Sequence, residues 1–209
     1  MDGISLIQVS EGGLNEISNM LIRLRELGIQ AASDTIGDTE RQFVDREFQS
    51  LKQEVDRIAN VTQFNGIPLL NGKAGIFEIQ VGVQNNPILD RIVYNGERAD
   101  ASLDALRLGG ESVATKQGAQ LSLSVIDDAL IRVNSIRADL GAMQNRLQST
   151  INNLAINEEN LSSANSRIRD TDVAHEVSEL TKQNILMQAG ISVLGHANET
   201  NAAALKLLS

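Results

Sequence analysis

The chain contains no cysteine, no tryptophan, two prolines and a single tyrosine among its 209 residues. Without cysteine it forms no disulfide bond, uses no thiolate nucleophile and builds no cysteine-ligated zinc site. Aromatic residues make up only 2% of the chain although hydrophobic residues make up 42%, so any core is aliphatic. Compact globular cores usually contain more aromatic rings, because each ring buries a large area. This composition therefore favours extended helical packing.

Clustered positive charge and long apolar runs are also lacking. The formal net charge is −9, and no run of lysine and arginine is present, whereas nucleic-acid binders present a basic surface. No apolar run approaches the ~20 residues of a membrane span. The opening letters MDGISLIQ contain no basic segment followed by an apolar one, so they do not form a secretory signal. We therefore expect neither nucleic acid nor a membrane as a partner.

What the sequence has in quantity is helical periodicity. The first expected helix covers residues 2–32, and its apolar seam alternates steps of three and four: Leu14, Ile17, Leu21, Leu24 and Ala31. The second covers residues 38–61 with Asp38 or Thr39 as its expected N-cap, and its seam is Val44, Phe48, Leu51, Val55 and Ile58. Two such helices joined by a short link should pack antiparallel.

A change of period follows the second helix. The letters IFEIQVGV alternate apolar and polar residues, ILDRIVYN is a second strand-like run, and QNNP between them has turn chemistry. These runs predict a β-hairpin over residues 75–94. The stretch 96–118 contains several glycines and is expected to be irregular.

The strongest periodicity predicts a long helix over residues 120–168. One heptad position holds an unbroken apolar row, expected to be a single seam that holds the fold together: Ile126, Val133, Leu140, Leu147, Leu154, Leu161 and Ile168. Such a helix is roughly 60–70 Å long at about 1.5 Å per residue, which exceeds the diameter of a globule of this mass. The predicted fold is therefore mainly α: an elongated, antiparallel, coiled-coil-like helical rod with a small β-hairpin. Residues 1–169 would form this core domain.

After the break at RDTDVAHEV, residues 170–209 form a separate amphipathic helical segment. Its apolar residues spread around much of the helix circumference, and no other part of the sequence is obviously left to cover them. This distribution predicts a surface for another chain, built from Val177, Leu180, Ile185, Leu186, Ile191, Leu194, Leu205 and Leu208.

Candidate catalytic features are few. The letters HEVSE at residues 175–179 resemble the start of the zinc-protease pattern HExxH, but Glu179 stands where the second histidine is required. The sequence has no phosphate-binding glycine loop, and its only other histidine, His196, also lies in the last segment, away from any candidate serine nucleophile. We predict no catalytic residue, no metal and no cofactor, and the residues alone indicate a self-associating helical protein.

Several stretches are similar to a known family. Four stretches of the chain resemble the C-terminal region of bacterial flagellin: RADLGAMQNRLQSTINNL, RIRDTDVAHEVSEL, KQNILMQAGISVLGHAN and NETNAAALKLLS. Two further stretches resemble the N-terminal core region of the family: DGISLIQVSEGGLNEISNMLIRLRELGIQAA and DRIANVTQFNGIPLLNG. The stretch FEIQVGV resembles the family's β-hairpin. The resemblance implies a secreted, extracellular structural subunit of the flagellar filament that self-assembles for motility and is not an enzyme. Flagellins begin with a further N-terminal stretch, and many insert a large variable outer domain where residues 95–120 stand here, so the resemblance implies a shortened member.

The resemblance also implies partners. These are other filament subunits, the filament cap and junction proteins, the flagellar type III export apparatus, and a flagellin-specific export chaperone that covers residues 170–209. A Toll-like innate immune receptor would read Arg23, Leu27, Gln30 and Glu47, with Arg25 and Glu26 between them. Gly28 stands where alanine is common in the family, and glycine weakens a helix by about 1 kcal/mol.

Two alternatives stay open at this point. A hook–filament junction protein shares the terminal architecture of flagellin, although the unbroken likeness of both halves favours the filament subunit. A secreted zinc hydrolase with flagellin-like helices belongs to a different class, and elemental analysis for bound zinc would distinguish it.

Overall fold

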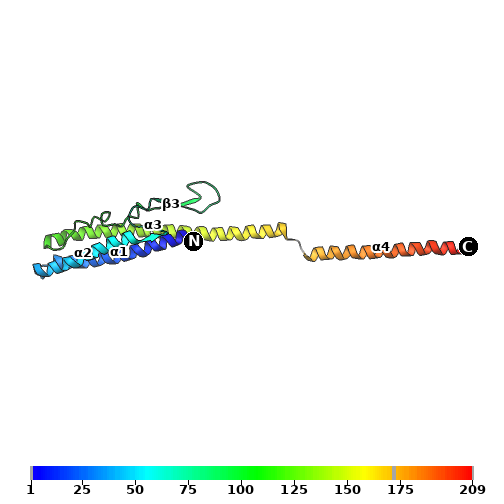
Figure 1. Cartoon of the computed structure of the whole chain (residues 1–209), viewed down its shortest axis with the longest axis horizontal. Coiled ribbons are helices and arrows are strands. Elements are labelled where there is room, and N and C mark those ends of the chain that lie inside the picture. Colours follow the sequence, from blue (N-terminus) through cyan, green and yellow to red (C-terminus); the bar gives the residue numbers. More distant parts are fainter. Residues whose placement is uncertain (1, 171–172, 209) are drawn as a thin grey trace. The chain divides into compact units, whose positions relative to one another are not determined.

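The computed structural model describes residues 2–170 and 173–208, with side chains described as far as Glu199. The elements in chain order are α1 (Asp2–Ala32), α2 (Asp38–Val61), β1 (Gln63–Phe64), β2 (Ile67–Pro68), β3 (Ile76–Gln80), β4 (Arg91–Asn95), α3 (Lys116–Arg169) and α4 (Val173–Leu208). Figure 1 shows these elements coloured along the chain. The chain divides into a first unit of residues 1–153 and a second unit of residues 154–209. The prediction of a mainly helical fold with a long helix and a small antiparallel sheet is confirmed.

In the first unit α1 runs antiparallel to both α2 and α3. Toward the start of α1, a Cβ added to Gly3 would lie 3.4 Å from the side chain of Leu147. Toward its end, Arg25 Nε donates to Asp127 Oδ1 over 2.7 Å, so rising numbers in α1 face falling numbers in α3. The pairing of Arg23 with Glu47 places α2 against α1 in the same antiparallel sense. The predicted pairing of the first two helices is therefore confirmed.

The core of the first unit is aliphatic, as the composition predicts. All three helices contribute fully or almost fully buried side chains: Leu14, Ile17, Leu21, Leu24 and Leu27 from α1, Phe48 and Val55 from α2, and Ile126, Val133 and Leu140 from α3. Burying each such side chain contributes about 1.5–3 kcal/mol. The three-four spacing works because it keeps these residues on one stripe of each helix.

The heptad row of α3 is buried over only part of its length. Leu140 and Leu147 are 3% and 4% exposed, whereas Leu154, Leu161 and Ile168 are 44%, 71% and 87% exposed. Leu147 lies beside the start of α1, whereas the three more exposed members of the row belong to the second unit. The expectation of one buried seam along the entire row is wrong after Leu147, because periodicity shows which face is apolar and not whether another helix covers it.

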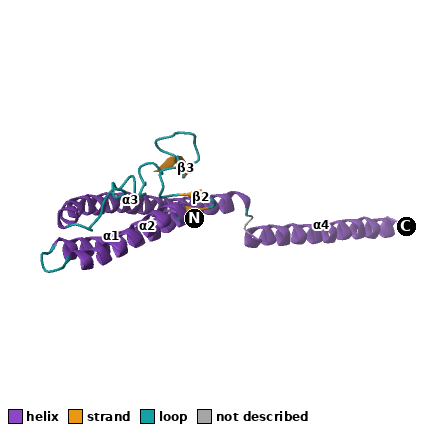
Figure 2. Ribbon diagram, turned by 60° about the vertical axis from the view of Figure 1, so that its left-hand side comes forward, coloured by secondary structure: helices purple, strands orange, loops and turns teal. Residues whose placement is uncertain are grey.

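The predicted hairpin at residues 75–94 is confirmed as β3 and β4, which pair antiparallel from Ile76 with Asn95 to Gln80 with Arg91. The hairpin lies alongside the helices of the first unit (Figure 2). Tyr94 on β4 is 1% exposed and donates its hydroxyl hydrogen to the carbonyl of Leu69 over 2.7 Å. The pKa of this phenol is raised, chiefly because burial disfavours the charged form.

A second hairpin, β1–β2, is absent from the sequence prediction. Its turn is Asn65-Gly66, with φ of 51° and 78°. Positive φ at both central residues is what a type I′ turn requires, and Asn-Gly is the strongest short signal for it. The Asn65-Gly66 dipeptide is the sequence signal from which this hairpin could have been predicted.

The start of α3 lies earlier than predicted, at Lys116 instead of residue 120. Thr115 acts as its cap, because its Oγ1 accepts a hydrogen bond from the amide of Gly118 over 3.1 Å. Gly118 also lets the preceding loop approach, since a Cβ there would lie 2.7 Å from the carbonyl oxygen of Ser112. The glycine that suggested an irregular segment is therefore part of the first helical turn.

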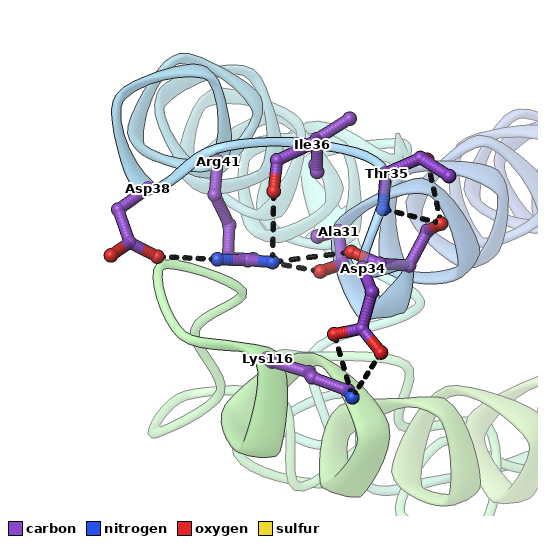
Figure 3. A network of polar contacts seen from close by, with 8 residues as sticks. Ala31, Asp34, Thr35, Ile36, Asp38, Arg41 and Lys116 are labelled. Atoms are coloured by element: carbon purple, nitrogen blue, oxygen red, sulfur yellow. Dashed lines mark hydrogen bonds and ion pairs between the residues drawn. The ribbon is translucent and has the colours of Figure 1, made fainter.

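The loop between α1 and α2 is organised by Arg41 and not by a capping side chain. Gly37 occupies the N-cap position of α2 without a side-chain hydrogen bond, so the expected caps Asp38 and Thr39 are wrong. Asp38 instead lies in the first turn and accepts from Arg41 Nη1 over 2.6 Å (Figure 3).

Arg41 is 5% exposed and reaches back across this loop. Its Nε donates to the carbonyl of Ala31 over 2.8 Å, and Nη2 donates to those of Ser33 and Ile36 over 3.2 and 3.3 Å. The carbonyls at the end of a helix have no intrahelical donor, and a cation there is favoured by the helix dipole. Arg41 therefore holds the end of α1, the loop and the start of α2 together.

Candidate interaction surfaces

Five predicted residues lie on two helices, and we call them the charged surface: Arg23, Arg25, Glu26 and Gln30 on α1 and Glu47 on α2. The guanidinium of Arg23 donates to Glu47 Oε1 over 3.0 and 2.9 Å and to Glu26 Oε2 over 3.0 Å. The hydrogen bond that Arg23 donates to Glu26, and after it the bonds that it donates to Glu47, raise the pKa of Arg23. Both carboxylates are about half exposed, so the group is oriented by its internal bonds while facing solvent.

Arg25 pairs with a carboxylate of α3 and not with one of α2. Its carboxylate partner, Asp127, is on α3, 102 positions away in the sequence. The sequence analysis missed Asp127, and no local pattern signals it, because the pair exists only once α3 packs against α1.

Leu27 and Gly28, which lie among these residues on α1, are buried. Leu27 is 1% exposed, so its side chain supports the charged surface from beneath and presents almost no area to a partner. A Cβ added to Gly28 would lie 3.0 Å from Leu123 on α3, which is tighter than ordinary contact. The glycine therefore allows α3 to approach closely here, and this packing gain offsets part of its cost in helix propensity.

The second unit carries an apolar surface on α4. Six of the predicted residues are 53–65% exposed, and we call them the α4 apolar surface: Val177, Leu180, Ile185, Leu186, Ile191 and Leu194. Leu205 and Leu208 lie within α4, but their side chains are outside the described residues. At 3.6 residues per turn these positions point to several sides of the helix, a distribution typical of helices surrounded by neighbours.

The HEVSE stretch lies on the surface of α4. Glu179 is paired with Lys182 one turn later at 3.3 Å. Across residues 2–170 and 173–199, no three histidine, aspartate or glutamate residues come together in a way that would hold a metal ion. Nor is any described helix both long and apolar enough to cross a membrane.

Comparison with known proteins shows which family the chain belongs to. A flagellin of Halalkalibacterium halodurans is 40% identical over 207 residues, which cover 99% of this chain and 75% of that protein. The chain belongs to the bacterial flagellin family. The patterns that define the bacterial flagellin N-terminal and C-terminal helical regions match residues 1–74 and 123–208.

Other members of the flagellin family agree. A flagellar filament 31.3 kDa core protein of Treponema maltophilum is 37% identical over 220 residues, covering 99% of this chain and 76% of that protein. The crystal structure of Bacillus cereus flagellin superimposes with a TM-score of 0.66 and 30% identity, covering 78% of this chain and 92% of that one. This flagellin-family chain is therefore a structural subunit of the flagellar filament. Neither a hook–filament junction protein nor a zinc hydrolase is favoured by these findings.

Proposed function

We propose that the α4 apolar surface is the principal self-assembly surface of this filament subunit. The observation that carries the proposal is the exposure of six large aliphatic side chains, each 53–65% exposed, on several sides of one helix. Each would contribute on the order of 1 kcal/mol or more if buried. A filament supplies neighbours on more than one side of a subunit, which suits an apolar surface that is not confined to one face.

The same surface explains why a chaperone would be needed. Apolar patches of this kind cause aggregation when they stay uncovered. We infer that a flagellin-specific export chaperone covers the α4 apolar surface as a helix-in-groove complex. The type III export apparatus would then deliver the chain to the outside, where it meets the junction and cap proteins and becomes part of the extracellular filament.

Replacing Ile185 and Leu186 by glutamine is expected to raise the critical concentration for polymerisation at least about tenfold, since about 1.4 kcal/mol corresponds to each factor of ten. Glutamine is a good helix former of similar length, so α4 should stay helical by circular dichroism. Pelleting and electron microscopy measure assembly, and calorimetry with the chaperone should show weaker binding. Gln183→Ala, on the same exposed turn, is the matched control; an unchanged critical concentration for the double variant would contradict the proposal.

We also propose that the charged surface is what a Toll-like innate immune receptor reads. This proposal is supported by the ion pairs of Arg23, which hold its guanidinium between two half-exposed carboxylates. A group oriented before binding loses less conformational entropy in the complex. Leu27 would act indirectly, by holding α1 against the core.

Glu47→Gln is expected to lower receptor signalling about tenfold, because it removes one carboxylate and releases Arg23 from its position. Glu40→Gln removes an exposed carboxylate earlier on the same helix and should leave signalling unchanged. Reporter cells that carry the receptor give the dose response. Equal effects of the two variants would show that only the net charge matters.

A further inference from the structure

Three asparagines of the first unit are followed directly by glycine: Asn65, Asn71 and Asn95. In such a pair the glycine amide nitrogen can attack the side-chain carbonyl carbon of the asparagine, because glycine carries no side chain that shields its nitrogen. The new C–N bond closes a cyclic imide while the side-chain nitrogen leaves as ammonia. Water then opens the imide at either carbonyl and gives aspartate or isoaspartate. The reaction needs no enzyme and no cofactor, so the local structure sets its rate at each pair.

The structure holds both reacting groups of the pair at Asn95. Its Oδ1 accepts hydrogen bonds from the amides of Glu97 and Arg98 over 3.0 and 3.2 Å. The attacking nitrogen is occupied as well, because the amide of Gly96 donates to the carbonyl of Gly75 over 2.8 Å. Gly96 is also buried, and a Cβ added to it would lie 3.1 Å from that carbonyl oxygen. Closing the imide at Asn95 would therefore break these hydrogen bonds in a closely packed region.

Asn71 is held through both ends of its side-chain amide. Its Oδ1 accepts from the amide of Lys73 over 3.1 Å, and its Nδ2 donates to Oδ1 of Asn60 over 3.4 Å. The following glycine, Gly72, packs against Asp100, since a Cβ added to Gly72 would lie 2.6 Å from the carboxylate. Asn71 and Gly72 are both half-buried, so this pair is also protected.

Asn65 and Gly66 form the exposed turn between β1 and β2, and neither residue is held in this way. Within the part of the chain that the structure describes, the Asn65 side chain makes no hydrogen bond and the Gly66 amide donates none. A Cβ added to Gly66 would meet no atom within 4 Å. The turn must rearrange before the imide closes, but β1 and β2 contain only two residues each, and so short a pairing opens easily.

We propose that Asn65 is a site of spontaneous deamidation in the folded chain, and that the structure shields Asn71 and Asn95 from the same reaction. Loss of ammonia makes the conversion irreversible, so the converted fraction rises with the age of a subunit. The proposal does not depend on the assembly role of α4, because the conversion at each asparagine is measured on the folded chain itself.

The isoaspartate product changes more than the charge of the turn. Its main chain runs through the side-chain carbon, so the turn is one carbon longer and the two-residue loop that sets the β1–β2 register is lost. Leu69 and Leu70 follow directly and are fully buried, and the Leu69 carbonyl accepts the hydroxyl hydrogen of Tyr94 over 2.7 Å. A Cβ added to Gly13 of α1 would lie 2.9 Å from Leu70. Isoaspartate at the turn is therefore expected to weaken the packing of this segment on α1.

The full chain would be incubated in mildly alkaline buffer, once folded and once in urea, and digested with trypsin at intervals. Asn95 lies in the tryptic peptide 92–98, whereas Asn65 and Asn71 share the peptide 58–73, in which fragmentation in the mass spectrometer locates the new acid. In the folded chain we expect Asn65 to convert faster than Asn71 and at least about tenfold faster than Asn95, the factor that about 1.4 kcal/mol of local protection gives. In urea the three rates should converge.

Asn65→Asp is the matched control for the effect on stability, because it adds the charge without the extra backbone carbon, and aspartate also tolerates the left-handed conformation. Chains that contain isoaspartate at this position, separated by chromatography, should unfold at a lower urea concentration than Asn65→Asp when Tyr94 fluorescence is followed. Equal midpoints for the two would contradict the loss of packing.

Three results would overturn the assignment of the site. Equal rates at Asn65 and Asn95 in the folded chain would mean that the structure makes no selection. Earlier conversion of Asn71 than of Asn65 would mean that its hydrogen bonds give no shielding. A folded chain that keeps Asn65 intact, while all three asparagines convert in urea, would mean that the turn protects its own pair.

Discussion

Leu140→Ala is expected to lower the free energy of unfolding of the first unit by about 2–5 kcal/mol. Leu140 is 3% exposed, and shortening a buried leucine loses both its burial energy and the contacts around the cavity that remains. Tyr94, the only tyrosine of a chain without tryptophan, is buried in this unit. Its fluorescence during urea unfolding therefore reports the stability of the first unit specifically.

Leu161→Ala provides the matched control for this prediction. Leu161 occupies the same heptad position of α3, three heptads further along, but is 71% exposed. Substitutions at exposed positions usually change stability by no more than about 0.5 kcal/mol. The urea concentration at the midpoint of unfolding, followed by Tyr94 fluorescence, should therefore stay the same. Equal losses for the two variants would contradict the assignment of the core to residues 1–153.

Arg41→Met is expected to cost the first unit about 1.5–3 kcal/mol, the range for hydrogen bonds that involve a charged group. Methionine retains part of the packing of the arginine stem but donates nothing. The carbonyls of Ala31, Ser33 and Ile36 would each lose the hydrogen bond that the Arg41 guanidinium donates to them. Urea unfolding followed by Tyr94 fluorescence gives the change in free energy.

Two further variants separate the parts of this network. Asp38→Asn should cost much less, because the Asp38 side chain is 93% exposed and exposed ion pairs contribute about 0–1 kcal/mol. Arg41→Lys keeps the charge but replaces the planar fork by a single ammonium group, which reaches fewer of the three carbonyls. A loss for Arg41→Lys intermediate between those of the other two variants supports the network; a loss for Asp38→Asn as large as that for Arg41→Met would mean that the ion pair, and not the carbonyl contacts, carries the stability.

The two surfaces that we propose as interaction sites differ in how far the sequence predicts them. The α4 apolar surface follows from letters alone, because aliphatic residues on several sides of a helix without an obvious cover indicate a partner. The charged surface is predicted as a set of positions, but its composition depends on packing. Leu27 belongs to the core and Asp127 joins the group from α3, and neither fact is visible in the local pattern around Arg23.

The sequence by itself determined the helix positions, because apolar spacing and breaking residues act locally. It predicts α1 at residues 2–32 and α2 at 38–61 as observed, and it locates the β3–β4 hairpin. The tertiary structure alone decided which part of each apolar row is core. Leu140 and Leu161 occupy the same heptad position, yet Leu140 is buried in the first unit, where α1 packs against α3, and Leu161 is exposed in the second unit. Burial is a property of two surfaces that meet, so the order of residues within one helix does not contain it. The same reason explains Arg41, a charged residue that becomes buried because the carbonyls at the end of another helix accept its hydrogen bonds.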